Sequence, residues 1–127
     1  MNFDLTEEQQ MLQDSVARFV SDNYELEKRI ALAAEKQGFS SDNWKTIAEL
    51  GWLGMPFAEA DGGFGGNQVD TMVIMEQLGK GLVLEPFFAS IVLGGGALKR
   101  AGSSEQKAAL LPGVIDGSKQ LALAYAE

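Results

Sequence analysis

The chain lacks two residue types on which many catalytic sites depend. Its 127 residues include no histidine and no cysteine. Without histidine there is no Ser-His-Asp or Cys-His nucleophilic site, no His-Glu-x-x-His zinc site and no imidazole for proton transfer near neutral pH. Without cysteine there are no disulfides, thiolate nucleophiles or cysteine-bound metals. The groups left for chemistry are carboxylates, lysine, tyrosine or a bound cofactor.

Among the acidic residues, Glu85 differs from those on polar helix faces. It directly precedes Pro86 at the start of an apolar segment, where an acid complements the helix dipole. That structural role competes with a role in facing a ligand. The glycines at 62–66 and 94–96 lack the GxGxxG and GxxxxGK[ST] spacings of phosphate-binding loops. We interpret the first group as a flexible connector, and the second as either an early helix end or a point of close approach.

The composition describes one acidic globular domain. The formal net charge is −8 and the hydrophobic fraction is 46%, enough to fill a core. Three arginines and seven scattered lysines do not form the positive patch that a phosphate backbone requires, so nucleic-acid binding is not expected. The longest apolar run, around residues 86–93, is far shorter than the ~20 residues of a membrane span. The acidic, polar first ten residues do not resemble a targeting peptide, which predicts a cytoplasmic protein.

The apolar spacing predicts helices that would position these residues. Thr6 and Gln9 have the spacing of a capping box, Ser40 precedes a third helix, and Pro112 is expected to stop the last one. In the second helix, an inward face is expected to contain Leu26, Ile30, Ala33 and Ala34. Six helices are expected over residues 7–20, 25–37, 41–50, 68–78, 86–98 and 104–111. Residues 120–127 alternate like a strand, which would have no partner within the chain.

Three segments together resemble the amino-terminal helical domain of the flavin-dependent acyl-CoA dehydrogenases. They are residues 5–9 (LTEEQ), 44–66 (WKTIAELGWLGMPFAEADGGFGG) and 102–117 (GSSEQKAALLPGVIDG). They occur in the family's order and spacing, and the resemblance covers essentially the whole chain. The final residues, LALAYAE, fall where the family begins its A-x-T-E-P strand. A narrower resemblance, through Phe64-Gly-Gly and the Leu82–Phe87 run, is to the small subunit of pimeloyl-CoA dehydrogenase.

The resemblance implies an all-α, six-helix orthogonal bundle over residues 1–119 and the start of a middle β domain over 120–127. The family removes the α-proton of an acyl-CoA thioester with a carboxylate base while the β-hydride goes to FAD. Its electrons leave through an electron-transfer flavoprotein, and its subunits form homo- or hetero-oligomers. Because the base and most FAD contacts lie in the family's later domains, no catalytic residue is expected here. The chain alone is expected to be inactive and to bind little or no FAD.

The resemblance also implies two sets of binding residues. The acyl chain would contact the apolar helix, and Glu85 would read a polar or acidic chain end. The substrate set is Glu85, Pro86, Ala89 and Leu93. The flavin set is Leu123, Tyr125, Ala126 and Glu127. Ala126 stands where the family has a threonine, which removes one hydroxyl contact and leaves backbone contacts to the flavin.

The sequence leaves two alternatives to a role within a catalytic dehydrogenase. One is a free-standing helical interaction module. The other is a non-catalytic small subunit whose partner performs the chemistry, which the alanine at position 126 favours.

Overall fold

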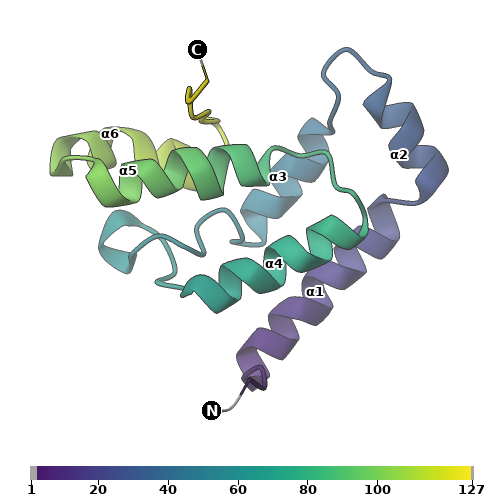
Figure 1. Ribbon diagram of the computed structural model, residues 1–127, viewed down its shortest axis with the longest axis horizontal. Helices are drawn as coiled ribbons and strands as arrows, with labels where there is room; N and C mark the ends of the chain where they lie inside the picture. The colour runs from purple at the N-terminus through teal and green to yellow at the C-terminus, as the bar shows by residue number, and fades with distance from the viewer. Residues whose placement is uncertain (1–2, 127) are drawn as a thin grey trace. The chain divides into compact units, whose positions relative to one another are not determined.

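The structure, a computed structural model, describes residues 3–126, and in this range its regular elements are all helical (Figure 1). The prediction of an all-α fold is therefore confirmed. The chain divides into two compact units, each made of two stretches of sequence. One contains the residues up to Phe39 together with Asn67–Leu84, and the other contains Ser40–Gly66 and the residues from Glu85 onward. Among the residues described, no helix combines the length and apolar character needed to cross a membrane.

The first unit is built on two helices that begin with the same kind of cap. Helix α1 (Glu7–Asn23) starts at Thr6, whose hydroxyl accepts from the Gln9 amide while the Gln9 side chain accepts from the Thr6 amide. Helix α4 (Gln68–Lys80) starts at Asn67, which forms the equivalent reciprocal pair with Asp70. These contacts satisfy amides that the helix itself leaves unpaired. The capping box predicted at Thr6 is confirmed.

Helices α1 and α4 lie side by side and form the core of this unit (Figure 1). A polar contact crosses the pair, because Gln9 Nε2 donates to Asp70 Oδ1 at 3.0 Å. Just beyond α4, the chain passes so near α1 that a side chain at Gly81 would overlap Val20. The buried apolar side chains of the unit are Val16, Phe19, Tyr24, Val73, Ile74 and Leu78.

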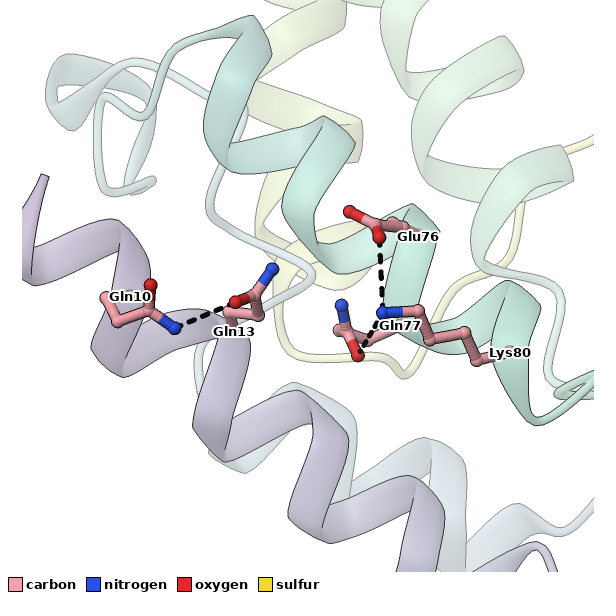
Figure 2. A network of polar contacts seen from close by, with 5 residues as sticks. All are labelled: Gln10, Gln13, Glu76, Gln77 and Lys80. Atoms are coloured by element: carbon pink, nitrogen blue, oxygen red, sulfur yellow. Dashed lines mark hydrogen bonds and ion pairs between the residues drawn. The ribbon is translucent and has the colours of Figure 1, made fainter. Parts of the chain in front are cut away.

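Further polar contacts follow each helix of the pair, and Figure 2 draws them. On α1, Gln10 Nε2 donates to Gln13 Oε1 at 2.8 Å. On α4, Lys80 Nζ lies 3.2 Å from Glu76 Oε1 and 3.4 Å from Gln77 Oε1. Gln77 is buried, and within the described part of the chain its Nε2 has no hydrogen-bond acceptor. The α1–α4 pair thus has polar groups in an otherwise apolar contact.

Helix α2 (Leu26–Ala33) differs from its prediction in both length and burial. It ends four residues before the predicted end at 37, and irregular chain leads to Gly38 in a left-handed conformation (φ +74°). The predicted inward face is wrong, since none of its residues is buried and Leu26 and Ile30 are 66% and 58% exposed. A periodic apolar face becomes a core face only where another element covers it, and the described residues provide none. A hydrogen bond from Arg29 Nε to the Leu82 carbonyl oxygen, 2.8 Å long, joins α2 to the chain that follows α4.

The second unit begins with helix α3 (Ser41–Glu49), which Ser40 caps by accepting from the Asn43 amide at 3.1 Å. Trp44 is buried, and its indole Nε1 donates to the Gly117 carbonyl oxygen at 2.9 Å. This bond joins residues 73 positions apart in the sequence. The apolar core of the unit consists of Trp44, Ile47, Trp52, Leu53, Phe57, Phe87, Ile91, Leu111 and Val114.

The glycine-rich loop at residues 62–66 is hydrogen-bonded to the backbone that precedes it, so the interpretation as a flexible connector is wrong. It follows a short 3-10 turn, η1 (Glu59–Asp61), and its amides return to the preceding backbone. Gly65 donates to the Phe57 carbonyl oxygen and Gly66 to that of Met55, both at 2.8 Å. A Cβ atom at Gly63 would overlap the Phe57 carbonyl oxygen. The glycines are needed because two backbone segments touch, which is a use that loop composition alone does not reveal.

The predicted fifth helix is present and does not end at its three glycines. A π-helical segment, η2 (Phe88–Gly95), continues directly into α5 (Gly96–Ala101). Of the two predictions made for these glycines, an early helix end is wrong, and close approach of another part of the chain holds for Gly94 and Gly95. A side chain at Gly95 would meet the Phe57 ring at 2.6 Å.

Helix α6 (Ser104–Ile115) begins with the Ser103–Gln106 capping box and passes through Pro112. The predicted stop at this proline is wrong. Proline cannot donate an amide hydrogen bond to the preceding turn, but its carbonyl oxygen accepts from the Asp116 amide at 3.0 Å, so the last turn forms after it.

The strand predicted for residues 120–127 is also wrong for the part that the structure describes. Residues 119–126 are irregular chain, and Glu127 lies outside the described residues. The side chains of this segment do alternate in type, but a strand also needs a neighbouring strand to complete its hydrogen bonds. The Leu121 amide instead donates to a helix side chain, the hydroxyl of Ser90.

Candidate functional site

Two of the four predicted acyl-chain residues, Ala89 and Leu93, lie on η2, and the other two lie just before it. Pro86 precedes η2, and its carbonyl oxygen accepts from the Ser90 amide at 2.9 Å to close the first turn. Pro86, Ala89 and Leu93 are half-buried, whereas the neighbouring Ser90 and Gly94 are fully buried or nearly so. The structure therefore places these three predicted residues on one apolar segment, each with part of its surface accessible.

Glu85, the fourth predicted substrate residue, already has a structural partner. Its side chain is only 5% exposed, and its Oε1 accepts from the Ser40 amide at 3.1 Å. Ser40 is the N-cap of α3, so this carboxylate ties the start of α3 to the turn before η2. An acid at this place stabilises an otherwise unpaired amide. This structural role concerns α3, whereas the sequence had suggested a role at the start of the following helix. Contact between Glu85 and a substrate tail stays a prediction.

The predicted flavin-facing residues lie on the exposed end of the chain. Leu123 is 43% exposed, Tyr125 is 81% exposed, and Ala126 is also exposed. Glu127, the fourth member of the set, lies outside the described residues. Apolar side chains and main-chain amides fit the edge of a planar, partly polar ring such as a flavin, although they form only a small part of such a site.

Two residues that the sequence analysis did not select join these two regions. Ser90 Oγ accepts from the Leu121 amide at 3.0 Å, and a side chain at Gly94 would lie 2.5 Å from Leu121 Cβ. Gly94 could be suspected from the glycine triplet, but Ser90 gave no signal beyond being a hydroxyl within an apolar helix. Next to this contact is a hollow of about 360 Å³ between α5, α6 and residues 121–123. Among the described residues that line it, only Gln106 has a polar side chain.

The carboxylates with shifted titration lie elsewhere in the unit, at the two ends of α6. At its start, the pKa of Glu105 is lowered by a hydrogen bond from its own backbone amide and by one from the Ser103 hydroxyl. At its end, the pKa of Asp116 is lowered by hydrogen bonds from the Ser118 hydroxyl and amide, and the amide bond measures 2.8 Å. Both groups are exposed, Glu105 in the first turn of α6 and Asp116 at its C-cap. Their shifted pKa values thus reflect hydrogen bonds at the ends of this helix, outside the predicted binding residues.

The structure is a helical domain with a partly accessible apolar helical segment and an exposed stretch at residues 122–126. Residues 6–118 match the family described as "Acyl-CoA dehydrogenase, N-terminal domain". The chain belongs to the acyl-CoA dehydrogenase family, as its N-terminal domain. The family predicted from the sequence is thus confirmed.

Individual relatives agree with this assignment. The chain is 35% identical over 124 residues to a probable acyl-CoA dehydrogenase of Bacillus subtilis, YngJ, covering 93% of this chain and 31% of that protein. Among solved structures, the ChsE4-ChsE5 complex from Mycobacterium tuberculosis matches with a TM-score of 0.87 and 29% identity, covering 96% of this chain and 34% of that one. An acyl-CoA dehydrogenase complexed with FAD from Bacillus anthracis matches with a TM-score of 0.82 and 26% identity, covering 93% and 20%. The chain therefore spans about a third of the length of the curated relatives it matches.

Proposed function

We propose that this chain is the N-terminal part of a flavin-dependent acyl-CoA dehydrogenase, which forms an α,β double bond in an acyl-CoA thioester. In this proposal residues 1–119 are the helical domain and residues 120–127 begin the next one. The observation that carries the proposal is the arrangement on η2. Half-buried Ala89 and Leu93 lie beside Ser90, which binds the start of the exposed segment at Leu121.

In this function the apolar helix binds the acyl tail and keeps water away from it. Pro86, Ala89 and Leu93 present partly accessible apolar surface, to which methylene groups can transfer from water. Each buried methylene contributes about 0.8 kcal/mol of binding free energy. The small side chain at Ala89 leaves room that a larger one would fill, so this position is suited to setting the preferred chain length.

The exposed segment would contact FAD, which when bound supplies the acceptor for the β-hydride. Leu123 and Tyr125 would pack on the flavin, and main-chain groups near Ala126 would supply hydrogen bonds. The alanine lacks a hydroxyl, which removes one hydrogen bond of about 1 kcal/mol. The similar Bacillus anthracis protein, which is described in complex with FAD, supports this cofactor.

Other components complete the proposal. In this proposal the catalytic carboxylate base lies in the family's later domains, as the resemblance implies. An electron-transfer flavoprotein would take the electrons, and the subunits would assemble with further dehydrogenase subunits in the bacterial cytoplasm. The two-protein ChsE4-ChsE5 complex supports an assembly of this kind.

The test replaces Ala89 with leucine in the whole flavoprotein that carries this chain. We expect KM for long acyl-CoA substrates to rise about tenfold while KM for short ones stays unchanged, because the added methyls occupy tail space alone. Ala109→Leu, an exposed position on α6, is the matched control and should change neither value. Equal effects on long and short substrates would contradict the tail site. Absence of flavin reduction by any acyl-CoA in the wild-type protein would contradict the proposed function.

A second candidate is a non-catalytic small subunit, the type indicated by the narrower resemblance to the pimeloyl-CoA enzyme. Ala126 favours it, because a subunit without chemistry of its own has no need for a threonine hydroxyl at the flavin. Ala126→Thr distinguishes the two candidates. In a catalytic subunit the restored hydroxyl should tighten FAD binding several-fold, measured by flavin fluorescence. An unchanged FAD affinity, with the flavin released only from a partner subunit, would favour the second candidate.

A further inference from the structure

Ser90 is an unusual residue for the centre of an apolar helix. Its side chain is completely buried, and the other residues of η2 are all apolar or glycine. A buried hydroxyl destabilises a protein unless it has a hydrogen-bond partner. Here the partner is the main-chain amide of Leu121, 31 residues later, at 3.0 Å. The hydroxyl therefore fixes a backbone position rather than another side chain.

Gly94 makes the same contact possible from the next helical turn. A Cβ atom there would lie 2.5 Å from Leu121 Cβ and 3.4 Å from the Leu121 carbonyl carbon. The approach of Leu121 thus depends on the missing side chain. Gly96 has no such constraint, because a Cβ atom added there would find its nearest neighbour, Arg100 Nη1, at 3.8 Å. The three consecutive glycines are therefore not equivalent, and only some of them are required by packing.

We propose that Ser90 and Gly94 form a seat for Leu121 and thereby position the flavin-binding segment against the acyl-binding helix. This inference depends on the proposed function. Ser90 and Gly94 alternate along η2 with Ala89 and Leu93, the half-buried residues assigned to the acyl tail. One helix thus holds the tail with some residues and the segment with others.

Leu121 is close enough in sequence to the proposed flavin-binding residues to limit where they can lie. Tyr125 follows Leu121 by four residues, which span at most about 14 Å. The intervening Ala122 and Leu123 line the hollow beside α5 and α6, and residues 122–126 are all exposed. A displacement of Leu121 would therefore also move the nearby residues that are proposed to contact the flavin. Ser90 and Gly94 are accordingly positioning residues, since they act through the segment and not on the reacting atoms.

The test uses Ser90→Ala in the whole flavoprotein, because this variant removes the acceptor and little volume. Amide hydrogen exchange at Leu121 should accelerate about tenfold when its bond is lost. The FAD dissociation constant should rise several-fold and the visible circular dichroism of the flavin should change, while KM for acyl-CoA stays within twofold. Gly94→Ala should produce larger changes of the same kind, and Gly96→Ala should match the wild type in all three measurements.

Each outcome of these measurements either supports the proposed role of Ser90 and Gly94 or overturns it. Unchanged exchange at Leu121 in Ser90→Ala would show that the seat is absent. Faster exchange with unchanged FAD affinity and dichroism would show a purely structural contact, and either result overturns the inference while the function stands. A wild-type protein that takes up no FAD would overturn the proposed function, and the inference with it. If Gly94→Ala fails to fold, the milder Ser90→Ala still decides.

Discussion

The two units of this chain share two kinds of stabilising contact, of which side-chain bonds are clearest in the first unit and close backbone approaches in the second. In the first, α1 and α4 are joined and ended by side chains, including two capping boxes and the bond between Gln9 and Asp70. In the second, backbone segments approach at Gly63, Gly66 and Gly94, where there is no side chain to separate them. Polar side chains contribute a modest net stability each and can be lost singly. Close backbone contacts tolerate almost no addition, because a packed interior has no spare volume.

The largest effect is expected where a side chain is added to the second unit. Gly63→Ala places a Cβ atom against the Phe57 carbonyl oxygen and should lower the free energy of unfolding by about 3 kcal/mol. Urea unfolding of the chain followed by tryptophan fluorescence would measure it, because Trp44 and Trp52 are buried in that unit. A loss below about 1 kcal/mol would mean that the loop moves freely, as the sequence had suggested.

Removing a cap tests the first unit. The Asn67 side chain accepts from the Val69 amide at 2.7 Å and from the Asp70 amide at 3.2 Å. Asn67→Ala should therefore cost about 1 kcal/mol, and Asn67→Asp, which keeps an acceptor, should cost much less. Chemical unfolding followed by far-ultraviolet circular dichroism would give both values. Equal losses for the two variants would contradict a capping role.

A glycine-to-alanine change in the first unit should raise the free energy of unfolding rather than lower it. Gly79 lies within α4, and a Cβ atom added there would meet nothing within 4 Å. Gly79→Ala should raise the free energy of unfolding by about 0.5 kcal/mol, since alanine favours a helix. Measured beside Gly63→Ala, it gives the sharpest contrast between the units. Two losses of similar size would remove the distinction.

The smallest effect concerns pH. Asp116 accepts from the Ser118 amide at 2.8 Å, and the Ser118 hydrogen bonds lower the pKa of its exposed carboxyl from 3.8. Because the folded pKa is lower than the unfolded one, the carboxylate stabilises the fold above pH 3.8 and loses this effect as the pH falls through the folded pKa. Asp116→Asn should cost less than about 1 kcal/mol at pH 7, and the difference from wild type should vanish in acid. Unfolding midpoints at several pH values would show whether it does.

Local patterns explain why most helix beginnings could be predicted. The caps at Thr6, Ser40 and Ser103 involve residues within three positions of one another, so their chemistry is complete in a short window of sequence. The helix that carries Pro86, Ala89 and Leu93 was recognised for a similar reason, since a continuous apolar run after proline needs no distant information. Its π-helical geometry was not recognised, because it arises where the helix meets other parts of the unit.

Other features required the tertiary structure. The apolar period of α2 resembled a core face, yet Leu26 and Ile30 are exposed because burial depends on a covering element elsewhere in the chain. The alternation at 120–126 resembled a strand, yet the Leu121 amide binds a helix hydroxyl, since residues 3–126 contain no strand that could pair with it. Ser90 could not be chosen from the sequence, since its partner is 31 residues away.

By itself the sequence determined the helical class and the positions of the capped helix starts, because these depend on residue types at short, regular spacings. The family was recognised from the resemblance of three segments in the family's order. Only the tertiary structure decided which apolar faces are buried, which glycines are required and what the end of the chain touches. Those properties depend on pairs of residues that are distant in sequence, and no local pattern contains the position of the second partner.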